Sequence, residues 1–248
     1  MADPFTFARD GGETIAYRRI AGRGPGILWL GGFHSDMSGS KAQALSDWAE
    51  KNDRAFLRFD YFGHGESSGD FAAGTISRWR DDALAVLDEL TEGPQMLVGS
   101  SMGGWISTLL AHARPERVAG MLLIAPAPDF TEDLIWSRMP PEVQAVVQEK
   151  GVWNYAEGGY PITRTLLEDG RNNLVLNKIL RAKWPVRILH GTADTDVPWQ
   201  QGFKLVDQIE GDVTFTLVKG ADHRISSPTN LKLIEITLEA LLKEMDAC

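Results

Sequence analysis

The chain has 248 residues, 43% of them apolar and 24% charged, and its 34 acidic and 25 basic side chains give a formal net charge of −9. This length suits one large domain that buries its own core, and the composition excludes a disordered or collagen-like chain. The acidic balance argues against nucleic acid as the main partner, because phosphate binding requires clustered Lys and Arg.

The cysteine content and the N-terminal segment favour a reducing compartment. Cys248 is the one cysteine of the sequence, so neither an internal disulfide nor a cysteine-based zinc site is expected. The first residues lack the cationic start and apolar run of a secretion signal, and the longest apolar stretch, residues 119–128, is too short to span a bilayer. We expect a cytoplasmic protein without integral membrane association. A longer precursor with a targeting segment and the oligomeric state stay open.

Short apolar runs alternate with amphipathic stretches along the chain. The apolar runs predict strands at residues 14–20, 26–30, 55–59, 96–98, 118–124, 186–189 and 213–218. Apolar residues at helical spacing predict helices at residues 40–50, 76–90, 102–113 and 231–242. Strands rich in Val, Ile and Leu that alternate with helices indicate right-handed crossovers. The expected fold class is α/β, with a mostly parallel twisted sheet flanked by helices.

One long interval interrupts this alternation. Between Pro126 and Lys183 no strand is expected, and the pattern predicts helical pieces at residues 142–150, 164–168 and 174–180. We interpret residues 126–183 as a helical cap or lid inserted into a single domain, residues 1–248. Ligands of open α/β sheets bind beyond the carboxyl ends of the strands, so an insertion at that edge would cover the site.

Gly99-Ser100-Ser101-Met102-Gly103 is the strongest chemical signal in the sequence. It joins a predicted strand to a predicted helix, and only Ser101 has a glycine two residues away on both sides. A nucleophile elbow holds its serine in such a strained turn, where the flanking glycines permit close backbone packing. The helix N-terminus then offers N–H groups to a developing oxyanion. A Gly-Ser loop that only caps the helix is the alternative, and the strand–turn–helix context favours the elbow.

A serine nucleophile needs a base and a group that orients the base. In an elbow-type site these residues follow in the order Ser, Asp, His, each after a strand. Of the five histidines, His223 is the one in a loop after a strand and downstream of the candidate acids. Asp194 and Asp196 both lie in the loop after the strand at residues 186–189, so the spacing leaves the acid open between them.

These motifs resemble the α/β-hydrolase superfamily over the whole chain. Residues 190–198 match that superfamily's acid loop, His-Gly-x-x-Asp-x-x-Val-Pro, and the resemblance places the acid at Asp194. Gly31-Gly32-Phe33-His34 follows a predicted strand at the place where the superfamily supplies an oxyanion donor from the backbone. The match implies that the N–H groups of Phe33 and Met102 form the oxyanion hole. The first position of this loop is usually His and is glycine here.

The remaining histidines are interpreted as structural. Asp60 and His64 belong to a stretch similar to the superfamily's Asp-x-x-Gly-His-Gly-x-Ser turn, which is structural, and two ligands are too few for a metal site. His34 is expected as an exposed loop residue, and His112 and His190 as helix-end and strand-end residues. We expect neither a metal nor a cofactor.

Several further stretches narrow the resemblance. They are similar to a mitochondrial branch that acts on palmitoylated proteins and acyl glucuronides, and to its bacterial relatives. The stretches are Ser-Gly-Ser-Lys-Ala, Gly-Ser-Ser-Met-Gly-Gly-Trp and Asp-His-Arg. The resemblance implies a serine hydrolase that cleaves carboxylic esters or thioesters, of acyl-protein or acyl-glucuronide type, through a Ser-His-Asp triad and an acyl-enzyme. Its expected partner is a small-molecule or acyl-chain substrate. An aminopeptidase, a perhydrolase and a non-catalytic ligand-binding scaffold of the same fold are the alternatives, and the intact set of three residues argues against the scaffold.

The insertion is also expected to line an apolar pocket over Ser101. The candidate wall residues are Trp136, Met139, Tyr155, and Leu166 or Leu167.

Overall fold

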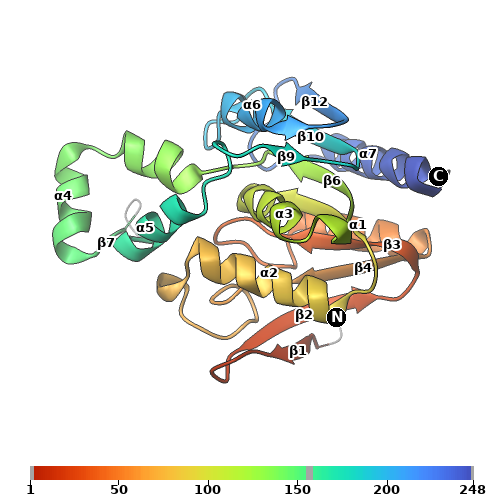
Figure 1. Cartoon of the computed structure of the whole chain (residues 1–248), viewed down its shortest axis with the longest axis horizontal. Coiled ribbons are helices and arrows are strands. Elements are labelled where there is room, and N and C mark those ends of the chain that lie inside the picture. The colour runs from red at the N-terminus through yellow and green to blue at the C-terminus, as the bar shows by residue number, and fades with distance from the viewer. Residues whose placement is uncertain (1–2, 155–158, 247–248) are drawn as a thin grey trace.

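An eight-stranded sheet forms the centre of the molecule in the computed structural model, which describes residues 3–154 and 159–246 (Figure 1). The strand order is β1-β2-β4-β3-β5-β6-β10-β12. β1, β2 and β4 pair antiparallel, and all neighbours from β4 to β12 run parallel. The strands are β1 (Phe5–Ala8), β2 (Thr14–Ile20), β3 (Arg23–Leu30), β4 (Arg54–Phe59), β5 (Gln95–Ser100), β6 (Val118–Ile124), β10 (Val186–Gly191) and β12 (Val213–Val218). The expected α/β class with a mostly parallel sheet is confirmed.

Helices cover both faces of the sheet (Figure 1). α1 and α7 bury their apolar sides on one face, and α2, α3 and α6 on the other. The helices are α1 (Ser40–Lys51), α2 (Ile76–Leu90), α3 (Met102–Ala113), α4 (Pro141–Lys150), α5 (Arg164–Asn172), α6 (Trp199–Gln208) and α7 (Pro228–Asp246). Trp79 of α2 and Trp105 of α3 are completely buried, and burial of such rings supplies much of the hydrophobic free energy of a core.

The segment between β6 and β10 protrudes from one edge of the molecule, at the left of Figure 1. After two short turns of helix, η3 (Thr131–Ile135) and η4 (Trp136–Arg138), it contains α4, an antiparallel pair of strands and α5. The prediction that no strand occurs here is wrong: β7 (Val152–Asn154) pairs with β8 (Pro161–Thr163), and β9 (Leu180–Arg181) pairs with β11 (Ile209–Glu210). Strands of two or three residues are too short for a periodic pattern to reveal.

The helix predicted at residues 174–180 is also wrong. These residues, all of them described, form a turn that leads into β9. The buried carboxylate of Asp129 accepts the backbone N–H groups of Val175 and Leu176 at 2.9 and 3.0 Å. Asp129 lies 46 and 47 residues before these donors, so a contact from a distant part of the chain fixes this stretch, and the local apolar spacing could not reveal it.

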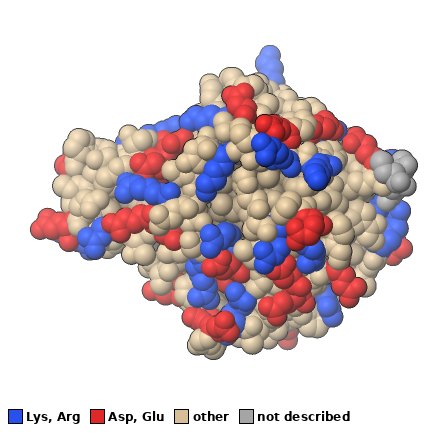
Figure 2. All heavy atoms as spheres, in the orientation of Figure 1, with Lys and Arg blue, Asp and Glu red and all other residues tan. Residues whose placement is uncertain are grey.

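The surface carries charges of both signs. On the face shown in Figure 2, Lys and Arg side chains are interspersed with Asp and Glu. Arg114 and Arg117 both pair with Asp88 in this way. Within residues 3–154 and 159–246, no helix is long and apolar enough to cross a membrane.

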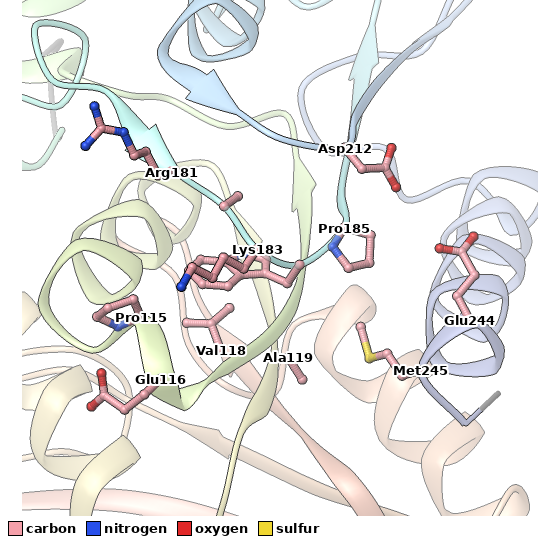
Figure 3. A pocket seen from close by; sticks show the side chains of 12 residues that line it. Pro115, Glu116, Val118, Ala119, Arg181, Lys183, Pro185, Asp212, Glu244 and Met245 are labelled. Atoms are coloured by element: carbon pink, nitrogen blue, oxygen red, sulfur yellow. The ribbon is translucent and has the colours of Figure 1, made fainter. Parts of the chain in front are cut away.

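A cavity of about 960 Å³ opens at the amino-terminal ends of the parallel strands (Figure 3). Val118 at the start of β6, Lys183 and Pro185 before β10, and Met245 near the end of α7 line it. The predicted site residues follow the carboxyl ends of the same strands, so this cavity lies at the opposite edge of the sheet from them.

Candidate active site

Ser101 lies in a strained turn between β5 and α3. Its backbone has φ 55° and ψ −119°, a conformation that a residue with a side chain rarely adopts. The neighbouring glycines make the turn possible: a Cβ at Gly103 would collide with the backbone of Leu30, and one at Gly99 with the backbone of Gly103. The strain holds the serine side chain at the carboxyl edge of the sheet, as expected for a nucleophile elbow.

The structure brings the three predicted residues Ser101, His223 and Asp194 together. Nε2 of His223 is 3.0 Å from Oγ of Ser101, and Nδ1 of His223 is 2.7 Å from Oδ2 of Asp194. His223 comes from the loop after β12 and Asp194 from the loop after β10. Because both strands are parallel to β5, all three side chains reach the same edge of the sheet. Both distances are within hydrogen-bond range for a nucleophile, a base and an orienting carboxylate.

The geometry selects Asp194 over Asp196 as the partner of His223. Asp194 is 8% exposed, and its Oδ1 accepts the backbone N–H groups of Asp196 and Val197 at 3.1 and 2.8 Å. Asp196 is exposed and supplies a backbone donor to Asp194. Burial by itself would raise the pKa of Asp194, but hydrogen bonds from His190, His223 and the Val197 backbone outweigh it and hold that pKa well below its usual range. Asp194 therefore stays ionised.

His190 is a contact of the acid that the sequence prediction missed. It was expected only as a strand-end residue, yet it is completely buried with Nε2 3.2 Å from Oδ2 of Asp194 and 2.9 Å from the carbonyl oxygen of Val197. The proton on Nε2 can be shared between these two acceptors. The signal was present in the acid-loop motif, because a histidine four residues before the acid lies at the end of the same strand.

The predicted oxyanion donors come from the start of α3 and from the loop after β3. Met102 is the first residue of α3, and Phe33 lies in the loop after β3, where Gly32 approaches the Cβ of Ser101. In the part of the chain that the structure describes, neither the Phe33 N–H nor the Met102 N–H donates to a protein acceptor. Both donors are thus available next to Ser101.

The turn at residues 60–67 supports the loop that carries Phe33. Nε2 of His64 is 3.2 Å from the backbone N–H donor of His34, and Nδ1 is 3.1 Å from the carbonyl oxygen of Phe62. This pattern fits a neutral ring with the proton on Nδ1, and burial lowers the pKa of His64 to about 4. Asp60 accepts the N–H of Met37 at 2.6 Å. Among the described residues, no group of three or more His, Cys, Asp or Glu is placed to hold a metal.

A cavity of about 670 Å³ lies between Ser101 and the protruding segment, and we call it the cap cavity. Its walls are mostly aromatic and aliphatic and include Phe33, Ala127, Phe130, Leu134, Ile135, Met139, Trp153, Tyr160 and Val197. His34 lines it as well, with its ring 4.9 Å from that of Phe71 and 5.3 Å from that of Tyr160.

The structure confirms part of the predicted pocket wall. Met139 lines the cap cavity, whereas Trp136, Leu166 and Leu167 do not. Leu166 and Leu167 belong to α5 and are buried in the core, and the ring of Trp136 packs against Arg171. Tyr155 lies outside the described residues. Apolar spacing identified the segment as apolar on one side, but could not distinguish core-facing residues from those facing the cavity.

The fold and the elbow together define an α/β hydrolase, and comparisons with known proteins agree. Residues 27–155 match the family model described as serine aminopeptidase, S33. The mitochondrial palmitoyl-protein thioesterase ABHD10 of Rattus norvegicus is 36% identical over 94% of this chain and 80% of the relative. The structure of mouse α/β hydrolase domain-containing protein 10 superposes with a TM-score of 0.91 at 35% identity and covers 98% of this chain and 100% of that one. A crystal structure from Agrobacterium vitis S4 superposes with a TM-score of 0.90 at 41% identity and covers 96% of this chain and 97% of that one.

The chain belongs to the serine aminopeptidase S33 family of α/β hydrolases, and its relatives in it include the ABHD10 thioesterases. This membership confirms the expected class of enzyme, an esterase or thioesterase of the α/β-hydrolase type.

Proposed function

We propose that the protein hydrolyses acyl thioesters and carboxylic esters, with Ser101 as nucleophile, His223 as general base and acid, and Asp194 as the orienting carboxylate. The observation that supports this most directly is the hydrogen-bonded series from Ser101 Oγ through His223 to the buried Asp194, at 3.0 and 2.7 Å. A serine is a weak nucleophile unless an adjacent base takes its proton, and this geometry supplies that base.

In the acylation step, Ser101 Oγ attacks the acyl carbonyl carbon while His223 Nε2 takes the hydroxyl proton. The carbonyl oxygen becomes an oxyanion, which the N–H groups of Phe33 and Met102 stabilise. Collapse of the tetrahedral intermediate breaks the bond to the leaving sulfur or oxygen, and His223 returns the proton to that atom. Asp194 stabilises the transient imidazolium without becoming protonated.

Deacylation repeats these roles with water in place of the serine. His223 takes a proton from water, the hydroxide attacks the acyl carbonyl, and the same two N–H groups hold the second oxyanion. Ser101 regains its proton as the carboxylic acid leaves.

The acyl chain occupies the cap cavity in this proposal, with residues 126–183 acting as the cap. The walls of that cavity are mostly apolar, and burial of a methylene contributes about 0.8 kcal/mol. The name of the ABHD10 relatives, palmitoyl-protein thioesterase, supports an acyl thioester, including one carried by a protein. An acyl glucuronide, an ester of the same acyl group, is the second substrate type we propose.

The test compares kcat/KM for one medium-chain acyl group presented as a p-nitrophenyl ester, a thioester and an amide of a prolyl amine. We expect Ser101→Ala to lose ester and thioester hydrolysis by on the order of a million-fold, as for other serine nucleophiles, while its circular dichroism spectrum is retained. Ser100→Ala, which removes the neighbouring hydroxyl, is the matched control and keeps most of the activity.

The amide distinguishes the ester reading from the activity after which the family model is named. The leaving amine must be protonated as it departs, which makes the amide the harder substrate. If the amide had the highest kcat/KM of the three, the aminopeptidase assignment would replace ours.

A cytoplasmic location also stays a prediction, since the ABHD10 relatives are named as mitochondrial. Cell fractionation with an antibody to the chain tests it.

A further inference from the structure

A second cavity, of about 470 Å³, meets the cap cavity at the candidate nucleophile, and we call it the α1 cavity. Both cavities are lined by Phe33, His34, Ser101, His223 and Arg224. Beyond this shared part, the α1 cavity is formed by the loop after β3, the first turn of α1 and the loop after β12. A substrate held at Ser101 therefore has two differently built spaces available, one for each side of the bond that breaks.

The two spaces differ in chemistry. The cap cavity is walled mostly by aromatic and aliphatic side chains, with Arg138, Asp196 and the shared Arg224 among its polar lining. The α1 cavity is lined largely by glycines and serines and adds Lys41 to the shared Arg224. Asp36 is the carboxylate among its lining residues, and Oδ1 of Asp36 already accepts the backbone N–H and the hydroxyl of Ser38. Lys41 and Arg224 outnumber Asp36 among the side chains that line the α1 cavity, so this lining is positive in a protein whose overall charge is −9. Arg138 and Arg224 outnumber Asp196 around the cap cavity in the same way, so Lys41 is the cation that the α1 cavity has to itself.

Lys41 is held at the cavity by both ends of its side chain. It is the second residue of α1, and its Nζ donates a hydrogen bond to the backbone carbonyl of Arg224, the residue after His223. Burial lowers the pKa of Lys41 to about 8. The negative charge of Asp222 opposes this shift, and the positive charge of Arg224 adds to it. An ammonium group has three donors, and over the described ranges Arg224 is its one hydrogen-bond acceptor. A partly desolvated cation with donors to spare gains more from an anion than a fully hydrated one does.

Arg224 and the start of α1 add to the positive electrostatic potential of the α1 cavity. Arg224 is exposed, and within the described part of the chain its guanidinium makes neither an ion pair nor a hydrogen bond. The first turn of α1 has no acidic side chain, and Gly39 at its N-cap supplies no side-chain acceptor. The positive end of a twelve-residue helix therefore faces the cavity together with the two cations.

We propose that the α1 cavity binds an anionic group, a carboxylate or a phosphate, on the leaving half of the substrate, and that Lys41 and Arg224 determine this specificity. The proposal rests on the proposed function, because it assigns the acyl half to the cap cavity and the thiol or alcohol half to the α1 cavity. In the acylation step the bond between the acyl carbon and the leaving sulfur or oxygen breaks, His223 protonates that atom, and the anionic product leaves past Lys41. Its charge does not change in the reaction.

The experiment compares thioesters that share one medium-chain acyl group and differ in the thiol. N-acetylcysteamine supplies a neutral leaving group, 3-mercaptopropionate supplies one with a carboxylate, and coenzyme A supplies one with phosphates. The readout is the ratio of kcat/KM for each anionic thioester to that for the neutral one. We expect this ratio to be about tenfold or more in the wild type, through a lower KM, since binding a remote charge affects ground and transition states alike. The two anionic thioesters show whether a carboxylate or a phosphate fits better.

Variants connect this ratio to the two cations. Lys41→Met keeps the aliphatic part of the side chain and removes the charge, and we expect it to lower the ratio about tenfold; Arg224→Gln should lower it as well, and Lys41→Arg should restore most of it. Lys51→Met removes an exposed lysine at the other end of α1 and is the matched control, with an unchanged ratio. A wild-type ratio near one, or a ratio that Lys41→Met leaves unchanged, would overturn the proposal while leaving the proposed function intact.

A binding measurement decides the point even where turnover is slow. Calorimetric titration of the Ser101→Ala protein with the 3-mercaptopropionate thioester should give a Kd about tenfold lower than with the neutral thioester, and Lys41→Met in that background should remove the difference. Equal Kd values for the two thioesters would contradict the proposal. Loss of hydrolysis of all three thioesters by the wild type, in contrast, would count against the proposed function itself.

Discussion

At the scale of single residues, Asp194 is distinguished from Asp196 by burial and by its donors. Asp194 accepts His223, His190 and two backbone N–H groups, whereas Asp196 is exposed. We expect Asp194→Asn to lower kcat for a p-nitrophenyl ester on the order of ten-thousand-fold, the loss known for this substitution in another Ser-His-Asp enzyme. Asp196→Asn should lower it less than about threefold. The reverse order in the same assay would move the acid to Asp196.

His190 provides a subtler test of how the acid is held. Its Nε2 lies 3.2 Å from Oδ2 of Asp194 in a site without solvent exposure, so its removal leaves the carboxylate with one donor fewer. A hydrogen bond to a charged group contributes about 1.5–3 kcal/mol, so we expect His190→Gln to lower kcat about tenfold and to shift the acidic limb of the pH–rate profile. His112→Gln, at the end of α3 and away from Asp194, is the control. A pH profile identical to that of the wild type would assign His190 a purely structural role.

The sequence predicted the residues of the candidate site better than their surroundings. Ser101 and His223 each follow a predicted strand, and Ser101 also has a glycine two residues away on both sides. Spacing left the acid open between Asp194 and Asp196, and the match of residues 190–198 to the superfamily's acid loop placed it at Asp194. The contact of His190 with Asp194 depends on how the acid loop folds back, and the exposure of residues in the cap depends on packing between segments far apart in the sequence. The acid-loop motif places His190 four residues before the acid, but spacing alone gives neither the contact nor the exposures.

At the scale of elements, the distinction between local patterns and contacts distant in the sequence also explains which helices and strands were predicted. α2 was predicted at its full length because one apolar side faces the core over several turns. α3 was also predicted at its full length, although residues 102–111 are buried on all sides of the helix. α6 was missed because Gly202 interrupts its helical pattern. That glycine is required by packing, since a Cβ there would lie 2.5 Å from Nδ1 of His190. The strand β1 was missed because it has four residues, most of them exposed at the sheet edge.

If η3 and η4 form part of the proposed cap, the apolar cavity that they line predicts how activity depends on acyl length. Each methylene buried in the cap cavity contributes about 0.8 kcal/mol, so kcat/KM should rise about fourfold per added CH₂ until the cavity is filled. Ile135→Asp places a charge in the apolar wall and should flatten this rise. Val152→Asp changes an exposed residue of the same segment that does not line the cavity, and should keep the wild-type rise. A flat dependence in the wild type would place the acyl chain elsewhere.

The turn that supports the oxyanion loop predicts a pH dependence of stability. Burial lowers the pKa of His64 from 6.5 to about 4, so between these values the unfolded chain binds a proton that the folded chain does not. The contribution of His64 is therefore complete above pH 6.5 and is lost as the pH falls to about 4, a change of about 3 kcal/mol. Asp60, whose pKa burial raises to about 6, acts in the opposite direction over part of this range.

Comparison with His64→Gln isolates the histidine, because Asp60 is present in both proteins. We expect the difference in free energy of unfolding between wild type and variant, measured in urea, to shrink by up to about 3 kcal/mol from pH 7 to pH 4. A difference that does not change with pH would show that His64 titrates alike in the folded and unfolded chains.

At the scale of the whole molecule, parallel strands bring one catalytic candidate each from β5, β10 and β12 to a single edge of the sheet. The cap cavity and the α1 cavity meet there at Ser101, while the cavity of Figure 3 lies at the other end of the strands. From this arrangement we infer that an acyl group is transferred to Ser101 and then to water.

The measurement that tests this claim most directly is mass spectrometry of the intact protein during turnover of a p-nitrophenyl ester, quenched in acid. We expect a mass increase equal to the acyl group, mapped to Ser101 in the peptide that contains it, and no increase in the Ser101→Ala protein. An acyl group found on another residue, or the same increase in Ser101→Ala, would contradict it.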